Sequence, residues 1–572
     1  MKKKTPKIYC CDFETTSKAQ YLVEGRTRVY LWKLMSIDEK EDYYNISMLS
    51  FFEKLKEFKR DALIYFHNLS FDGEFINWYL LENGYEYDEE RTKPKTFSSI
   101  IDETGSIYSI TIKLETEITI DFRCSYKLFP MSIEKIGTIV GVTKLKETHN
   151  YEELKNYNSV DELPKEELSY IHNDVLIMVK FIKYLRQMGI SGMTMSSSAY
   201  KNWKKEKYQL CKYQMKKDTN EEIVEIVRKS YRGGITKVNN KYAGVDIYDA
   251  ISFDVNSLYP SVMYQNVMPI GEGKIFSNVE ECLNEHRYAY IVVVVVTTAK
   301  IKEGYHAFIG NQSGFSYARQ YSYDDYLENK VLYLWGKEFN LFKMCYEGQY
   351  AISKVVGWKT AKYVFKDYID RWYHLKETTT NPVEKQLAKL MLNSLYGKFG
   401  MNDTRISKMP VGCSEDKILY ESDETSCVYY YKEVASYITS LARCKLVTFM
   451  QMCGDDFIYC DTDSLYLKGH DIPDHFLPVI DDKKLGFWKY EGHYKHFRAW
   501  KAKCYLKQLD NDVIERKIAG CPKECASLIN FDNFYPNVEL KNCKKVKKKV
   551  RGGIIIDTTH FKIHIERKDN ET

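Results

Sequence analysis

Two aspartates separated by one threonine, Asp461 and Asp463, lie between two short apolar runs. The run Phe457-Ile458 precedes them and Leu465-Tyr466-Leu467 follows, which predicts two short strands joined by a tight turn at Asp461-Thr462. Such a turn holds both carboxylates close together. Their repulsion lowers stability unless a divalent cation lies between them, so the motif indicates a metal site.

A further acid, Asp254, ends a predicted strand upstream that includes Ser252 and Phe253. Either motif alone is equally well explained as a solvated turn, because Asp is a common turn residue. Together, a strand-end Asp and an Asp-Thr-Asp hairpin supply the ligands for two Mg²⁺ ions. That arrangement serves in-line phosphoryl transfer.

The segment 385–398, between these motifs, has the periodicity of an amphipathic helix. One stripe is apolar, and the opposite face carries lysines one turn apart, followed by an Asn and a Tyr. Such a face can bind a triphosphate and cover a base, although a pair of surface lysines is the simpler alternative. The apolar stripe is Leu387, Leu390, Met391, Ser394 and Leu395, and the polar face is Lys385, Lys389, Asn393 and Tyr396.

A second set of acids lies near the N-terminus. Asp12 and Glu14 share one face of the predicted strand 8–16, because side chains alternate along a strand. Asp72 is predicted to end a later strand, and Asp174 lies one helical turn after Tyr170. Each acid alone is more readily a surface group. As a set, the four carboxylates are the minimum for two metals that activate a water, which Tyr170 would orient.

Length and composition indicate a large globular protein. The 572 residues predict several domains, and 44% hydrophobic with 28% charged residues gives a net charge of only +5. The basic run 541–551 is either a solvated face or a track for a phosphate backbone. The 15 cysteines have no paired CxxC sites, which predicts reduced thiols, and Ile291–Val296 is too short to span a membrane.

The order of these motifs resembles that of the family B DNA polymerases with an N-terminal 3′–5′ exonuclease, over nearly the whole chain. The three exonuclease motifs resemble Asp12–Glu14, Asn68–Asp72 and Tyr170–Asp174, and polymerase motifs A, B and C resemble Asp254–Pro260, Lys389–Gly397 and Tyr459–Ser464. Tyr231-Arg232-Gly233-Gly234 resembles the YxGG motif, and Lys503-Cys504-Tyr505 resembles the KxY motif. This resemblance implies an α/β (α+β) fold. An RNase H-like exonuclease domain would span 1–195, and a right-hand polymerase domain with palm, fingers and thumb would span 196–572.

A narrower resemblance is to the protein-primed polymerases of small tailed phages of Gram-positive bacteria. It is carried by Asp254-Val255-Asn256-Ser257-Leu258-Tyr259-Pro260, by Leu392–Phe399, and by a long insertion between motifs A and B. It implies a terminal-protein-binding insertion at about 266–364 and a strand-displacement insertion at about 404–426. The enzyme would be monomeric, would act without a membrane in the cytoplasm of the infected bacterial host, and would replicate a linear phage genome. A linear-plasmid polymerase of the same family is the alternative.

The resemblance also implies residue roles. Two Mg²⁺ ions per active site, replaceable by Mn²⁺, would be held by Asp254, the Val255 carbonyl and Asp463, with Asp461 in support. The exonuclease metals would be held by Asp12, Glu14, Asp72 and Asp174. Nucleotide contacts would come from Ser257, Leu258, Tyr259, Lys376, Lys385, Lys389, Asn393 and Tyr396, with Tyr259 at the position that excludes a 2′-hydroxyl. DNA contacts would come from His67, Asn68, Phe71, Ser125, Tyr126, Tyr231, Gly233, Gly234, Lys503 and Tyr505.

The partners implied are a DNA primer-template, single-stranded DNA, dNTPs and a terminal protein primer. One departure from the family is Tyr126, where its exonuclease motif has Leu. Two rival functions weaken on the residues themselves. A nuclease with a degenerate polymerase domain requires loss of Asp254 or Asp463, and a non-catalytic DNA-binding replication factor requires losses from both acid sets; all these acids are present.

Overall fold

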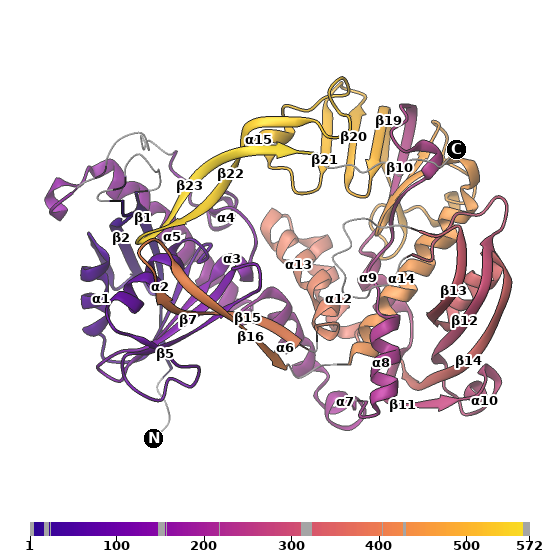
Figure 1. The fold of residues 1–572 in the computed structure, drawn as a ribbon, viewed down its shortest axis with the longest axis horizontal. Helices are drawn as coiled ribbons and strands as arrows, with labels where there is room; N and C mark the ends of the chain where they lie inside the picture. Colours follow the sequence, from indigo (N-terminus) through magenta and orange to yellow (C-terminus); the bar gives the residue numbers. More distant parts are fainter. Residues whose placement is uncertain are drawn as a thin grey trace.

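Two large sheets, a mixed one in the first half of the chain and an antiparallel one in the second half, organise the computed structural model (Figure 1). The structure describes residues 5–16, 22, 25–146, 155, 157–216, 218–310, 323–402, 404–426 and 431–563. Smaller sheets and hairpins extend from the second half. Among the described residues, no helix is long and apolar enough to cross a membrane.

The N-terminal sheet has eight strands in the order β3-β2-β1-β4-β8-β7-β6-β5. Its central strand β4 is buried throughout and runs parallel to both neighbours, as expected for a strand covered on both faces. The strands are β1 (Lys7–Thr15), β2 (Val29–Ser36), β3 (Asp42–Asn45), β4 (Ala62–Phe66), β5 (Glu86–Tyr87), β6 (Thr96–Ile101), β7 (Ile107–Lys113) and β8 (Thr119–Cys124).

Alternation along β1 divides its side chains between two cores. Tyr9, Cys11 and Phe13 join the core that includes helix α1 (Met48–Lys56) and helix α2 (Asp72–Glu82). Ile8 and Cys10 join the core that includes helix α5 (Lys165–Gln187). Asp12 and Glu14 continue this second set, so the strand directs both acids toward the α5 face.

The second large sheet has the order β21-β20-β19-β10-β18-β17-β9. β10 pairs antiparallel with β18 so that Asp254 lies opposite Ser464, which brings the strand-end acid beside the Asp461–Asp463 turn. The strands are β9 (Thr236–Val238), β10 (Ile247–Val255), β17 (Phe457–Asp461), β18 (Ser464–Lys468), β19 (Trp488–Lys501), β20 (Cys504–Leu509) and β21 (Ile514–Ile518).

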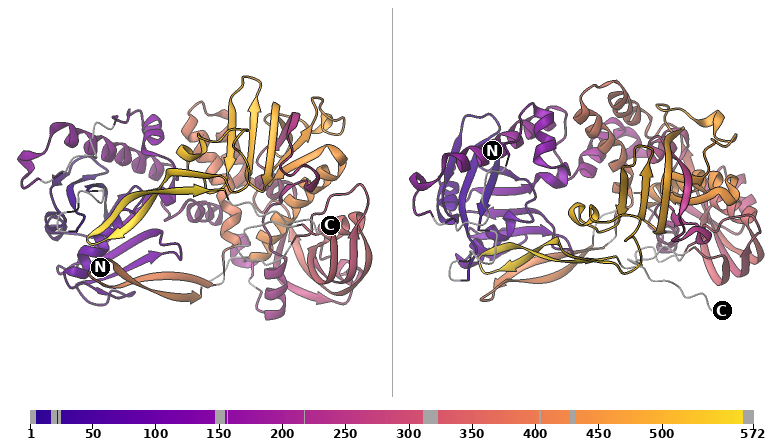
Figure 2. Two further views of the ribbon diagram at one scale, coloured as in Figure 1. Left: turned by 45° about the horizontal axis from the view of Figure 1, so that its top comes forward. Right: turned by 90° about the horizontal axis from the view of Figure 1, so that it is seen from above.

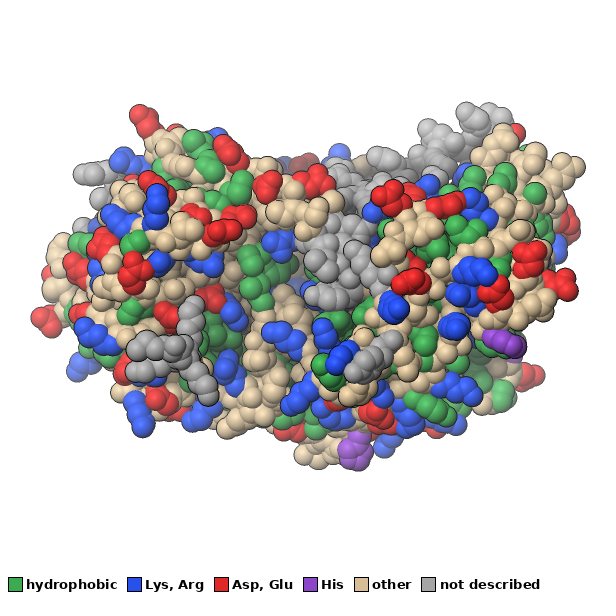
Figure 3. All heavy atoms as spheres, turned by 90° about the horizontal axis from the view of Figure 1, so that it is seen from below, with side chains coloured by type: hydrophobic (Ala, Val, Ile, Leu, Met, Phe, Trp, Pro, Cys, Tyr) green, Lys and Arg blue, Asp and Glu red, His purple; other side chains and the backbone are tan. Residues whose placement is uncertain are grey.

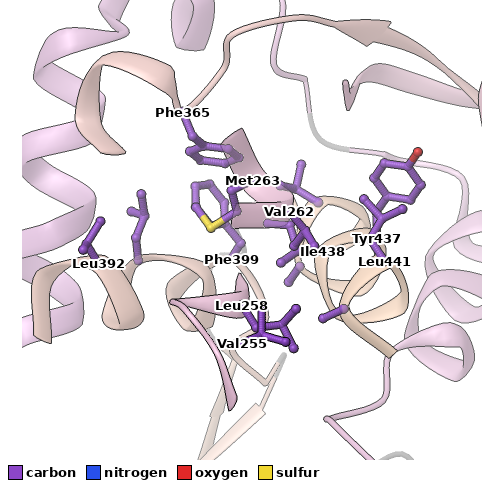
Figure 4. Packing of buried hydrophobic residues seen from close by; sticks show 14 of the residues in the cluster. Val255, Leu258, Val262, Met263, Phe365, Leu392, Phe399, Tyr437, Ile438 and Leu441 are labelled. Carbon is purple, nitrogen blue, oxygen red and sulfur yellow. The ribbon is translucent and has the colours of Figure 1, made fainter. Parts of the chain in front are cut away.

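Helices α9 (Leu258–Gln265), α12 (Lys366–Thr378), α13 (Pro382–Phe399) and α14 (Lys432–Met452) surround the end of β10. Figure 4 shows the apolar side chains between them, with Val255 and Leu258 next to Val262 and Ile438. Because these side chains are buried, the end of β10 and the start of α9 are held rigidly. Residues of motif A that face away from this core are therefore presented from a fixed backbone.

A separate four-stranded sheet, of order β11-β14-β12-β13, lies between motifs A and B. The run Ile291–Val296 is the middle of β12, where all but Val295 are buried. The elements are β11 (Met268–Phe276), α10 (Val279–Asn284), β12 (Ala289–Ile301), β13 (Tyr326–Trp335), α11 (Gly336–Cys345) and β14 (Tyr346–Ala361). They fall in the range predicted for the first insertion, of which residues 311–322 lie outside the described part of the chain.

Two long hairpins leave the second half of the molecule and converge on α2 of the first (Figure 1, Figure 2). One is β15 (Thr404–Cys413) with β16 (Ile418–Ser426), and the other is β22 (Glu539–Val550) with β23 (Gly553–Lys562). The second approaches α2 so closely that a Cβ on Gly553 would lie 2.6 Å from the Phe75 ring. The first hairpin coincides with the predicted second insertion.

Two local predictions are corrected by the structure. β17 ends at Asp461 and β18 begins at Ser464, so the turn residues are Thr462 and Asp463, with Thr462 in the left-handed region at φ 61°. Asp72 opens helix α2, because β4 already ends at Phe66. A carboxylate at the first position of a helix is favoured by the helix dipole, which the strand assignment overlooked.

The prediction of reduced thiols is wrong for one pair. Cys525 of α15 (Lys523–Ala526) and Cys543 of β22 form a disulfide, with Cα atoms 5.2 Å apart. Both belong to a small core beneath β20, which brings them together although 18 residues separate them. The other cysteines of the described residues are free, and Cys427 lies outside that part of the chain.

Candidate active sites

The N-terminal acids form one buried cluster. Burial, followed by the charges of Asp72 and Glu14, raises the pKa of Asp12 well above its usual range. Burial and Asp174 raise the pKa of Glu14 to about 8, and burial raises that of Asp72 to about 7. The charges of Asp72, Glu14 and Asp174 all act on Asp12, and a set of neighbouring carboxylate oxygens suits a hard divalent cation.

Lys144 enters this cluster, and the sequence analysis missed it. Its Nζ donates hydrogen bonds to both Asp174 carboxylate oxygens, at 2.8 and 2.6 Å, and to the Tyr170 hydroxyl at 3.1 Å. Lys144 lies in the loop after α4 (Ile133–Val140), where no local spacing distinguishes it from other lysines. Its charge offsets part of the repulsion among the acids.

Glu167 was missed as well, although a helical-face argument could have found it. It lies on α5, three residues before Tyr170 and seven before Asp174, and so shares their face. The side chain is buried and accepts hydrogen bonds from Lys155 Nζ at 2.7 Å and from the Tyr157 hydroxyl at 3.1 Å. These contacts direct Glu167 toward Lys155 and Tyr157, and its charge still raises the pKa of Glu14.

The residues predicted to contact single-stranded DNA divide into two groups. His67 is held between Ser125 Oγ, at 3.0 Å, and the Met131 carbonyl, at 2.8 Å, and burial lowers its pKa to about 4. Ser125 is itself buried. By contrast Tyr126 is 41% exposed, with its ring edge toward His67, and Asn68 is exposed at φ 72°. The first pair therefore shapes the site, and the second pair faces solvent.

The second acid site lies where β10 meets the β17–β18 turn. The Val255 N–H donates to the Asp463 carbonyl at 2.8 Å, which joins motif A directly to motif C. Burial and Asp463 raise the pKa of Asp254 to about 8, and burial and Asp461 raise that of Asp463 to about 6. The Val255 side chain is apolar and buried, so its backbone carbonyl is the one atom of this residue that could act as a ligand.

Asp461 differs from Asp254 and Asp463 because its carboxylate already binds other side chains of the protein. Its Oδ1 accepts hydrogen bonds from Thr236 Oγ1 at 3.0 Å and from Lys503 Nζ at 3.1 Å. The Lys503 N–H in turn donates to the Tyr459 hydroxyl at 3.0 Å. These contacts suit a carboxylate that supports the site through the KxY segment. Tyr505 of that segment packs beneath the turn, with its hydroxyl 3.2 Å from that of Tyr466.

Helix α13 presents the predicted polar face toward this site. Lys385, Lys389 and Asn393 are exposed, and Lys389 lies near enough to lower the pKa of both Asp254 and Asp463. The Tyr396 ring stacks on that of Tyr259, with centroids 4.3 Å apart and an interplanar angle of 17°.

Motif A, residues 254–260, contributes to the polymerase acid site mainly through its backbone and its polar side chains. On α12, Lys376 Nζ lies 3.5 Å from Ser257 Oγ. The Leu258 side chain is buried in the core shown in Figure 4, so only its backbone can face a nucleotide.

The loop 231–234 lies against the same site. A Cβ on Gly234 would meet Thr462 Cγ2 at 2.8 Å, so only glycine allows this approach. Arg443 of α14 donates to the carbonyls of Arg232, at 2.6 Å, and Gly233, at 3.0 Å, and both arginines bind buried Glu338. Neither Arg443 nor Glu338 was predicted, since Glu338 belongs to the first insertion.

The basic run 541–551 lies mostly on β22, and its basic side chains differ in what they contact. Lys549 Nζ forms an ion pair with Glu74 of α2 at 2.6 Å, and lies 4.0 Å above the ring of Tyr420 on β16. The Tyr420 hydroxyl donates to the other Glu74 oxygen at 2.9 Å. Part of the run thus joins elements of the protein instead of facing DNA. Elsewhere acidic and basic side chains intermingle, as the face in Figure 3 shows.

The two acid sites, the paired sheets and the loop 231–234 define a template-directed polymerase joined to an exonuclease domain. The chain belongs to the type B DNA polymerases, organellar and viral, whose family model matches residues 141–480. It is accordingly a DNA-directed DNA polymerase with an RNase H-like exonuclease domain and a palm, fingers and thumb, which confirms the predicted family and fold class. The reaction of this family depends on divalent metal ions.

More particularly, the chain is similar to phage polymerases of one group. The DNA polymerase of Bacillus phage phi29 is 31% identical over 588 residues, which cover 98% of this chain and 99% of the phage protein. That of Bacillus phage Nf is 31% identical over 592 residues, covering 97% and 99%. The solved phi29 polymerase with primer-template DNA and incoming nucleotides superposes with a TM-score of 0.89 at 30% identity, covering 98% and 100%.

Proposed function

We propose that this chain is a replicative, protein-primed and strand-displacing polymerase of a linear phage genome, which proofreads with its own 3′–5′ exonuclease. The observation that carries the proposal is the presence, in one chain, of two separate clusters of mutually repelling carboxylates, with two hairpins joined between them. By similarity to the phi29 complex, its ligands are primer-template DNA and dNTPs. We assign it to the host cytoplasm as a monomer.

The donor sets of both clusters fit Mg²⁺. Each offers carboxylate oxygens, and the raised pKa values of Asp254, Glu14 and Asp72 reflect repulsion and burial that a divalent cation relieves. Asp254, Asp463 and the Val255 carbonyl would hold the ions of the polymerase site. Asp12, Glu14, Asp72 and Asp174 would hold those of the exonuclease. Bound there, the ions would lower the pKa of the attacking hydroxyl or water and neutralise the leaving oxygen.

Protein side chains then position the substrates. Lys376, Lys385 and Lys389 neutralise the triphosphate, so that positioning and electrostatics account for most of the rate. The rings of Tyr259 and Tyr396 are stacked. In this proposal Tyr259 would exclude a ribose 2′-hydroxyl. Arg443 and Glu338 keep the loop 231–234 against the site.

In the exonuclease, Lys144 holds Tyr170 and Asp174 in one orientation, in which the tyrosine hydroxyl can orient the attacking water. Tyr126 offers an exposed ring on which a base can stack, a role that the Leu of related sequences cannot fill in the same way. The stack would hold the frayed 3′ end near the acids.

In this proposal the two insertions provide protein priming and strand displacement. The sheet β11–β14 would bind the terminal protein whose hydroxyl primes synthesis. The hairpin β15–β16 would arch over the template path and admit only a single strand. Each translocation step would then separate the downstream duplex, and no helicase would be needed.

Separate loss of each acid site tests the proposal. Asp463→Ala should abolish nucleotide incorporation, a loss of at least about a thousandfold, because an interaction specific to the transition state is removed. Degradation of single strands should continue. Asp12→Ala with Asp72→Ala should have the opposite effect. Primer extension and 3′-end degradation of labelled oligonucleotides measure both activities, and loss of both from one folded variant would refute two independent sites.

A further inference from the structure

Apart from the acid sites, one other group of metal-binding side chains converges in the described part of the chain. Asp249 of β10, His470 of the turn after β18, and His493 of β19 each offer one ligand atom, and these atoms lie within 4.8 Å of one another. Asp249 lies five residues before Asp254 on the same strand, about 17 Å along it. The cluster is therefore distinct from the polymerase site.

The geometry points to a binding site for a transition-metal dication such as Zn²⁺, with three protein ligands and an open fourth position. Asp249 Oδ1 lies 3.1 Å from His470 Nε2 and 3.3 Å from His493 Nε2. Ligand atoms on a tetrahedral Zn²⁺, with bonds of about 2.0–2.1 Å, are separated by about 3.3 Å. Asp249 thus already lies at the required spacing from each histidine, and the two histidine nitrogens lie within 4.8 Å of each other.

Hydrogen bonding supports a cation over a simple His–Asp network. His493 Nδ1 lies 2.8 Å from Asp510 Oδ1, the partner that usually fixes the ring of a metal-binding histidine. With the proton on Nδ1, Nε2 presents a lone pair toward Asp249. This Nε2 is buried, and among the described residues it makes no hydrogen bond despite its distance of 3.3 Å from Asp249. In this neutral tautomer two acceptors face each other, which is unfavourable unless a metal cation or a second proton lies between them.

The backbone conformation of Asp249 and the types of ligand atom also fit a transition-metal site. Asp249 has a left-handed φ of 61° within a strand, a strained conformation that breaks the alternation of side chains. Two imidazoles and a carboxylate favour Zn²⁺ or its neighbours over Mg²⁺, which prefers oxygen ligands. The site therefore differs in metal preference from both carboxylate clusters, and it would link β10, β19 and the turn after β18.

Metal titration of the full-length protein tests this inference. Chelator-treated protein is titrated with Zn²⁺ by calorimetry and with Co²⁺ by absorption, in excess Mg²⁺ to saturate the carboxylate clusters. We expect one equivalent to bind, with visible Co²⁺ bands and no thiolate charge-transfer band. Zn²⁺ should also raise the thermal unfolding midpoint.

Three variants and a control locate the ion. Asp249→Asn tolerates the left-handed backbone and should weaken binding at least about tenfold, as should His470→Gln; Asp510→Asn should weaken it about 10- to 100-fold. His286→Gln, an exposed histidine elsewhere, should bind as the parent does. Primer extension in Mg²⁺ should be unchanged in all four, which verifies folding. The inference fails if no equivalent binds, if a thiolate band appears, or if Asp249→Asn and His470→Gln bind like the parent.

Discussion

At the scale of single residues, charge repulsion is the main feature of both acid sites. Asp254 and Asp463 have pKa values of about 8 and about 6, raised mainly by burial and by neighbouring carboxylates. A carboxyl group whose pKa is raised on folding stabilises the folded state when it is protonated. This contribution is complete below the unfolded pKa, here 3.8, and is lost as the pH rises through the folded pKa. The metal-free site therefore destabilises the fold increasingly up to about pH 8.

Mg²⁺ should consequently stabilise the protein more near pH 8 than near pH 6, because more repulsion is present to be relieved. Asp254→Asn should raise the unfolding midpoint of the metal-free protein near pH 8 and reduce the added effect of Mg²⁺. Thermal unfolding with and without Mg²⁺ at the two pH values measures both effects. An equal Mg²⁺ shift at both pH values would contradict this account of the pKa values.

The stack of Tyr259 on Tyr396 yields a second prediction at this scale. Tyr259→Val should raise ribonucleotide incorporation relative to deoxynucleotides by about tenfold or more, since a smaller side chain leaves room for a 2′-hydroxyl and one discriminating contact is worth about 1–3 kcal/mol. Single-nucleotide incorporation gives kcat/KM for each substrate. Tyr264→Val, on the same helix α9, is the control. An unchanged preference in Tyr259→Val would place sugar selection elsewhere.

At the scale of elements, the hairpin β15–β16 is anchored at both ends. Its base follows α13, and its strands reach the N-terminal domain through a backbone bridge between Ser407 and Asp102. Arg405, Lys408 and Lys417 line it, and Met409 and Pro410 lie midway along β15, opposite Glu421 and Tyr420. An anchored hairpin can resist the force of an advancing duplex, which a loose surface loop cannot.

Replacing residues 404–426 by a short Gly linker should leave gap filling on single-stranded template near normal, because neither acid site lies on the hairpin. Extension should stall where a downstream duplex begins. Gapped and nicked substrates with labelled primers distinguish the two situations. If the variant copies through the duplex as far as the parent, displacement depends on another element.

At the scale of the whole molecule, the two hairpins meet at α2, where both contact Glu74. The polymerase half, the two hairpins and α2 thereby form a closed ring, called here the closed circuit. Tyr420 and Lys549 bind opposite oxygens of this buried carboxylate, and Lys549 also lies over the Tyr420 ring. Both hairpins begin in the polymerase half, and this contact joins them to each other, in addition to the Ser407–Asp102 bridge and the approach of Gly553 to Phe75. A closed circuit around DNA slows dissociation without any change in the chemistry of incorporation.

Lys549→Met should therefore shorten the product made per binding event severalfold, because the buried Glu74 loses its charged partner and the contact opens. Lys548→Met is a matched control, since it removes the same charge from the opposite face of β22. Extension of a primed circle under a competitor trap measures product length. Equal shortening in both variants would assign the effect to general loss of positive charge.

Much of this protein follows from local pattern in the sequence alone. The spacing of Asp12 with Glu14, of Tyr170 with Asp174, and of Lys385 with Lys389 determines which side chains share a face, because strand and helix periods are properties of the backbone. Order along the chain was then enough to predict two acid sites, the family and the fold class. Local pattern does not determine the exact residue at which a strand or turn ends. The turn was therefore predicted at Asp461-Thr462, whereas it lies at Thr462-Asp463.

Only the tertiary structure decided which distant residues complete these sites. Lys144 reaches Asp174, Glu338 anchors Arg443, and Tyr420 meets Glu74 across 346 residues of sequence. The same holds for the Cys525–Cys543 disulfide and for the convergence of Asp249, His470 and His493. None of these pairings has a periodic signal, because each depends on how separate elements pack, and that packing is determined by the whole chain at once.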